Sequence, residues 1–164
     1  MKSLKPVLLS LSLMLLLSCT SSTSDYAYNE KVTSIFLRQM RQIDETDSVF
    51  KDTSKVYAKE FSDSVSLGQK AENLVNNSKM ELADIADLKP GKEAEKFNAG
   101  IVAYLTAIND YGKTAQQMLQ AKTIGEKKKL HEQLMLKYEK LNTYPDRLLA
   151  IQKIYLNEVG LQPK

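Results

Sequence analysis

The chain has 164 residues and a formal charge of +3, with 43% hydrophobic residues, one Cys, one His and no Trp. This length is typical of a single globular domain. The lone Cys and lone His exclude a disulfide framework, a zinc ribbon and an iron–sulfur cluster, and the interspersed charges argue against a nucleic-acid binder.

The first segment of the chain has the composition of a secretory signal. Lys2 and Lys5 form a basic start, and residues 7–17 form an apolar run that only two serines interrupt. This run is too short to span a bilayer as a helix, which takes about 20 apolar residues. We therefore expect residues 1–18 to be a signal peptide and not a transmembrane helix.

The signal ends in Leu16-Leu17-Ser18-Cys19, which resembles the lipobox of bacterial lipoproteins. The resemblance implies cleavage before Cys19 and attachment of fatty acyl chains such as palmitate to that cysteine. It therefore implies a partner, the membrane, through an N-terminal lipid anchor. The alternative is an ordinary secretory signal with a coincidental or buried free Cys.

Residues 19–27 are expected to form the lipidated cysteine and a polar linker rich in Ser and Thr. A linker of about ten extended residues reaches roughly 35 Å, enough to lift the domain clear of the headgroups. The absence of Asp directly after Cys19 resembles lipoproteins released to the outer membrane. The resemblance thus implies a cell-envelope location, on the periplasmic face of the outer membrane or at the cell surface.

The mature chain shows the 3.6-residue period of helices and no sustained two-residue alternation. A first helix is predicted over about 28–47, ending between positions 44 and 54. Its inner face is formed by Val32, Ile35, Phe36, Gln39 and Ile43. A second is predicted from near 54 to 88, with a stripe of Tyr57, Phe61, Val65, Ala71, Val75, Leu82 and Ile85.

A third helix is predicted over about 92–120, after the Pro90-Gly91 turn. Its stripe is the clearest in the chain and consists of Phe97, Ile101, Tyr104, Ile108, Tyr111, Ala115 and Met118. The last helix begins at a capping box, Thr123 to Glu126, in which Thr accepts from a first-turn amide and Glu reaches back. Its stripe is Leu130, Leu134, Tyr138 and Leu141, continued by Leu148, Ile151, Tyr155 and Val159.

Proline inside a helix costs about 3 kcal/mol or more, so Pro145 should kink or restart this last helix. Gly160 and Pro163 are typical of a helix stop, which leaves residues 161–164 as a tail. Helices joined by short connections favour an all-α, antiparallel up-down-up-down four-helix bundle over residues 28–160.

The chain offers little for catalysis. His131 is the only histidine, flanked by Lys127 to Lys129 and Glu132, and is expected to be a solvated or rim residue. Paired carboxylates such as Glu81 with Asp84 are expected on solvated helix faces. We therefore expect no catalytic residues, no metal site and no cofactor, and a protein that is not an enzyme.

The mature part is similar to small all-helical envelope lipoproteins, many of them surface proteins. We expect a non-enzymatic interaction module whose partner, an envelope protein, meets the end of the bundle far from the membrane. That end would carry Asp44, Glu45, Asp47, Asp52, Lys122, Lys127, Lys128 and Lys129. The simpler reading is that these opposite charges pair with each other.

The alternative function is a carrier or sensor of a small apolar or aromatic ligand. The second helix carries small residues along one face, which allow close helix approach or leave a void. A pocket between the second and third helices would be lined by Ser64, Gly68, Ala71, Tyr104 and Tyr111. Close packing of these helices is the simpler expectation.

Overall fold

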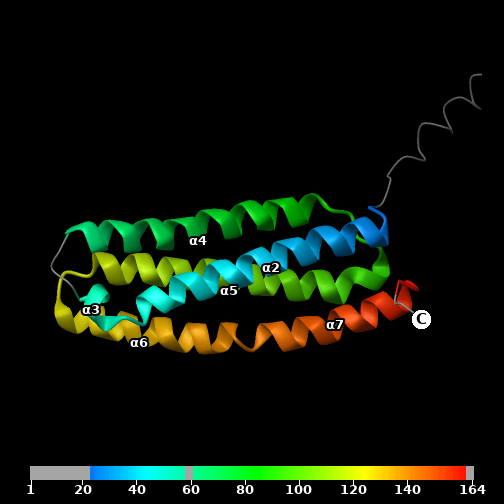
Figure 1. Ribbon diagram of the computed structural model, residues 1–164. Helices are drawn as coiled ribbons and strands as arrows, with labels where there is room; N and C mark the ends of the chain where they lie inside the picture. The colour runs from blue at the N-terminus through cyan, green and yellow to red at the C-terminus, as the bar shows by residue number, and fades with distance from the viewer. Residues whose placement is uncertain (1–22, 58–60, 162–164) are drawn as a thin grey trace, which may run out of the picture.

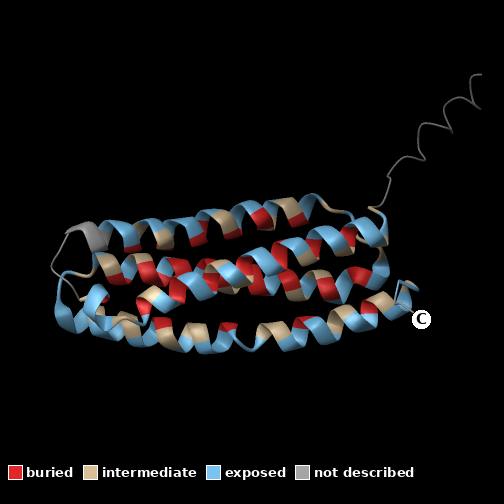
Figure 2. Cartoon of the chain, viewed as in Figure 1, coloured by how far each residue is buried: buried red, intermediate tan, exposed pale blue. Residues whose placement is uncertain are grey.

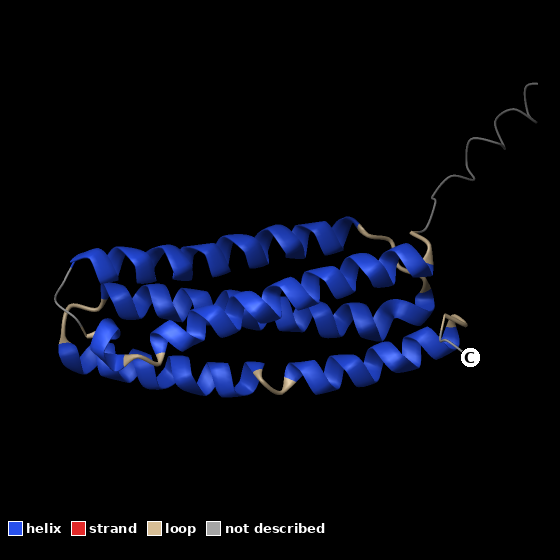
Figure 3. Ribbon diagram, viewed as in Figure 1, coloured by secondary structure: helices blue, strands red, loops and turns tan. Residues whose placement is uncertain are grey.

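The computed structural model describes residues 23–57 and 61–161, so the lipobox lies outside the described residues. The elements are α2 (Asp25–Phe50), α3 (Thr53–Val56), α4 (Phe61–Asp87), the 3₁₀ helix η1 (Lys92–Ala94), α5 (Glu95–Gln120), α6 (Ile124–Leu141) and α7 (Tyr144–Glu158). The described residues contain helices and loops but no strand (Figure 3), which confirms the all-α prediction. None of these helices combines the length and apolar character needed to cross a bilayer.

The long helices lie side by side in an antiparallel bundle (Figure 1). α2 and α5 run in one direction, and α4 and the α6–α7 pair run in the other. α5 packs against α4, α6, α7 and α2. We call the end with the start of α2, residues 88–94 and the end of α7 the entry end. The far end carries residues 44–57 and 121–131.

The predicted apolar stripes form the core. All five inner residues predicted on α2 and all seven predicted on α5 are buried, and the buried faces of the helices turn inward (Figure 2). On α4 the prediction for Val65 is wrong, because this side chain is 43% exposed. Leu67 is buried instead, and Val65 lies about 200° around the helix from it.

The boundaries of the last helix follow the sequence signals. The Thr123 hydroxyl accepts from the Glu126 amide at 3.1 Å, and the Glu126 carboxylate accepts from the Lys122 amide at 3.3 Å. α6 ends at Leu141 and α7 begins at Tyr144, with Pro145 in the first turn of α7. The predicted break at Pro145 is therefore confirmed.

The end of α7 is a Schellman motif. The Gly160 amide donates to the Asn157 carbonyl and the Leu161 amide to the Leu156 carbonyl. Gly160 has a φ of 71°, a left-handed conformation that glycine adopts without a steric penalty. The predicted helix stop at Gly160 is confirmed.

Two predicted boundaries at the start of the domain differ. α2 begins at Asp25, inside the predicted 19–27 linker, because the Ser24 hydroxyl caps the Ala27 amide at 3.3 Å. The predicted second helix is divided into α3 and α4. The Asp52 carboxylate accepts from the Ser54 amide and so starts α3 separately.

Candidate functional site

The acidic residues predicted at the far end lie there, but Asp47 is not on its surface. Asp47 is 1% exposed, accepts from the Tyr111 hydroxyl at 3.2 Å, and pairs with the Lys51 ammonium at 2.7 Å. The reason is its position in the buried stripe of α2, one turn after Ile43. The prediction that Asp47 faces a partner is therefore wrong.

Two of the other carboxylates of this group, Asp44 and Asp52, also have partners in the fold. Asp44 accepts from the Tyr138 hydroxyl at 3.1 Å, and the Lys51 ammonium lies 4.2 Å from the centre of the Tyr138 ring. The hydrogen bond to Asp47 raises the pKa of Lys51, and the hydrogen bond from Ser54 lowers the pKa of Asp52. Glu45 is exposed. Asp47 and Asp44 therefore join α2 to α5 and α6, and Asp52 caps the start of α3.

The lysines of the far end form fewer contacts within the fold than its carboxylates do. Lys122, Lys128 and Lys129 are exposed, and none forms an ion pair with a carboxylate of the described residues. Lys127 lies over the Tyr57 ring at 5.6 Å from its centre. Among described residues the lysines of α6 therefore do not pair with the acidic residues of α2, contrary to the simpler expectation.

His131 lies at the far end and is half-buried between elements. Its Nε2 is 2.9 Å from the Phe50 carbonyl oxygen, and its Nδ1 is 3.2 Å from the Tyr57 hydroxyl. Since the carbonyl only accepts, Nε2 carries the hydrogen and Nδ1 accepts from the Tyr57 hydroxyl. His131 is thus a contact that fastens α6 to the α2–α3 connection, more than a solvated rim residue.

The space predicted as a pocket is packed where its side chains are described. A Cβ added at Gly112 of α5 would lie 2.9 Å from Val75 Cγ2 and 3.2 Å from the Ala71 carbonyl oxygen. Tyr104 and Tyr111 are buried and pack against other aromatic rings. The ring centres of Tyr104 and Phe36 are 5.4 Å apart, and those of Tyr111 and Phe50 are 6.5 Å apart. Gly68 has no such neighbour, and the side chain of Ser64 lies outside the described ones. The small residues allow close helix approach.

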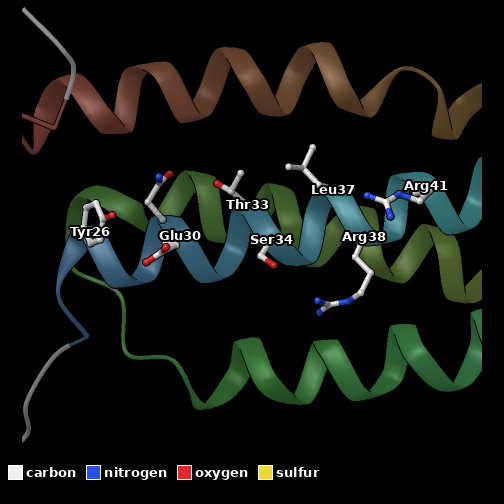
Figure 4. A pocket seen from close by; sticks show the side chains of 8 residues that line it. Tyr26, Glu30, Thr33, Ser34, Leu37, Arg38 and Arg41 are labelled. Atoms are coloured by element: carbon white, nitrogen blue, oxygen red, sulfur yellow. The ribbon is translucent and has the colours of Figure 1, made fainter.

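A cleft of about 680 Å³ lies along the outer face of α2 (Figure 4). One helix supplies its whole lining, so it is a shallow surface groove. Leu37 is 48% exposed in it, and the Arg38 side chain points toward α4. The lining residues are Tyr26, Asn29, Glu30, Thr33, Ser34, Leu37, Arg38 and Arg41. The groove offers apolar and cationic contacts to a partner.

Arg38 joins this groove to a buried carboxylate that the sequence placed on a solvated face. Glu81 of α4 is 1% exposed, and Arg38 Nε and Nη2 both lie 2.7 Å from its Oε1. Burial raises the pKa of Glu81, and the hydrogen bond from Arg38 opposes this rise. The Gln39 side chain, next to Arg38 in sequence, is also fully buried. Glu81 therefore ties α4 to α2.

Within residues 23–57 and 61–161, no cluster of three or more His, Cys, Asp or Glu side chains is arranged to hold a metal ion. Comparison with protein-family models, with curated proteins and with solved structures found no match.

Proposed function

We propose that the protein is a lipid-anchored cell-envelope protein that acts as a non-enzymatic interaction module. The lipobox-like Leu16-Leu17-Ser18-Cys19 supports the anchor. The antiparallel bundle supports a far end that is directed away from the anchor, because the chain enters at one end and the lysine-rich end lies opposite (Figure 1). The observation that carries the interaction role is the set of lysines on that far end without acidic partners in the described residues.

The lysines at the start of α6 oppose a local rule of helix stability. Lys127 is the fourth residue of α6 and lies in its first turn, where the helix dipole disfavours cations, and Lys128 and Lys129 follow it directly. In natural proteins, residues that are unfavourable for the local structure they occupy are found mainly at functional or strained sites. An acidic surface of an envelope protein has the charge that would complement these three side chains.

We expect Cys19→Ala to abolish incorporation of labelled fatty acid in a bacterial host and to move the protein out of the membrane fraction. The physical reason is that two or three acyl chains hold a protein stably at a membrane, whereas the bundle exposes no spanning helix in its described part. A wild-type protein that takes up no labelled fatty acid would contradict the anchor.

We expect the Lys127→Glu, Lys128→Glu and Lys129→Glu triple variant to fold, with a melting temperature lowered by at most a few degrees through loss of the Lys127 contact with the Tyr57 ring, but to lose its partner. Negative charge near the start of α6 is tolerated by the helix dipole, whereas the charge offered to the partner is reversed. The measurement is chemical cross-linking in whole cells followed by mass spectrometry, with circular dichroism for folding.

The matched control reverses Lys79, Lys113 and Lys140, three exposed lysines on the sides of the bundle. The control should keep the cross-linked partner of the wild type. Equal recovery by the far-end variant and the wild type would discard the far end and direct the search to the groove on α2.

A further inference from the structure

The folded domain begins closer to Cys19 than the sequence suggests. The Thr23 amide donates to the Lys89 carbonyl at 3.2 Å, which ties the chain to the α4–α5 turn. Two residues later, the Tyr155 hydroxyl donates to the Asp25 carbonyl at 2.9 Å, which ties the chain to α7. Thr23 is thus held by the entry end and does not belong to a free linker.

The remaining tether is short. Only Thr20, Ser21 and Ser22 separate Cys19 from Thr23, so the two residues are at most about 14 Å apart. The headgroup layer of one leaflet takes up roughly 5–7 Å of this reach. The space left between the entry end and the headgroups is then less than the width of one helix, about 10–12 Å. The 35 Å reach expected from the sequence is not available.

The entry end offers an interfacial side chain toward the tether. Tyr26 is the second residue of α2 and is 64% exposed. Tyr26 lies in the first turn of α2, at the end of the bundle where the chain enters (Figure 4). Tyrosine favours membrane–water interfaces, where its ring is partly buried and its hydroxyl stays wet.

The charges of the entry end do not select one kind of headgroup. Lys89 and Lys92 are exposed there, and so are Glu93 and Glu158. With both signs present, short-range contact with the headgroup layer is favoured over long-range attraction to strongly anionic lipid.

We propose that the entry end of the bundle rests on the lipid headgroup layer, with Tyr26 in contact with it and the far end directed away. This inference rests on the proposed anchor at Cys19. The entry end is then a second contact with the membrane, and the far-end lysines stand about 39 Å higher, the length of the 26 residues of α5.

The test uses the absence of Trp from the chain. Tyr26→Trp and Ile124→Trp each introduce one fluorophore at a comparably exposed position, 64% and 60%, at opposite ends of the bundle. Each acylated full-length variant is reconstituted into vesicles of phosphatidylethanolamine and phosphatidylglycerol in which a fraction of the headgroups carries a nitroxide, which quenches Trp at short range. Circular dichroism confirms that each variant folds.

We expect the Tyr26→Trp variant to lose about half of its fluorescence in vesicles with nitroxide headgroups relative to unlabelled vesicles, and the Ile124→Trp variant to lose none. No quenching in either acylated, vesicle-bound variant would overturn the contact and leave the anchor standing. Equal quenching in both would mean that the bundle lies flat, which also overturns it. A protein that is not acylated at all would overturn the proposed anchor and this inference together.

Discussion

Raising the pH from about 10 to about 11 should lower the free energy of unfolding by about 4 kcal/mol. The cause is a set of tyrosines in the core, Tyr28, Tyr104, Tyr111 and Tyr155, each at most 1% exposed. Burial is the main cause that raises the pKa of each of them above the ordinary tyrosine value. Nearby carboxylates add to the rise for Tyr104, Tyr111 and Tyr155.

The direction of the effect follows from where the proton is lost. Below about pH 10 these tyrosines are neutral in both the folded and the unfolded chain, and the stability that they contribute is fully present. Above that pH they ionise in the unfolded chain but not in the core. Unfolding then releases protons, and each tyrosine lowers the stability by about 1 kcal/mol over this interval.

The measurement is urea denaturation at a series of alkaline pH values. Tyr104→Phe is the matched variant, because it keeps the ring against Phe36 and removes one ionisable hydroxyl. It should recover about 1 kcal/mol of the loss. The account fails if absorbance titration shows that these tyrosines ionise near their ordinary pKa while circular dichroism shows that the chain is still helical.

Gly112→Val should destabilise the protein by about 3 kcal/mol, at the upper end for overpacking of a filled core. The added Cβ would meet Val75 Cγ2 at 2.9 Å and the Ala71 carbonyl oxygen at 3.2 Å. The second of these atoms belongs to the backbone of α4, so relief requires that α4 and α5 move apart. Urea denaturation followed by circular dichroism measures the loss.

Gly68→Val is the matched control for this substitution. Gly68 also lies within a helix, and an added Cβ would meet nothing within 4 Å. The control should stay within about 0.5 kcal/mol of the wild type. If Gly112→Val is as stable as Gly68→Val, the space between α4 and α5 is larger than described, and the ligand-carrier alternative regains support.

Local patterns predicted much of the fold. The stripe from Phe97 to Met118, the capping box at Thr123 and the break at Pro145 all depend on residues within one or two turns of each other. Such features need no knowledge of the neighbouring helices, because the period and the caps are set by the backbone of a single helix.

The contacts of particular polar side chains could not be predicted from the sequence. Asp47 and Glu81 are buried in the fold, and their partners there, Tyr111 and Arg38, come from other helices at separations of 64 and 43 residues. His131 likewise meets Phe50 across 81 residues. The close approach of α4 and α5, in contrast, is indicated by the sequence. Gly112 follows Tyr111 and precedes Ala115 by three positions, so it lies on the buried stripe of its helix.

The most direct test of the central claim is mass spectrometry of the mature N-terminus, purified from the membranes of a bacterial host. The account predicts a first residue of Cys19 that carries a diacylglycerol thioether, and a loss of that peptide in Cys19→Ala. An unmodified Cys19, or a mature chain that begins at any other residue, would contradict the lipid anchor.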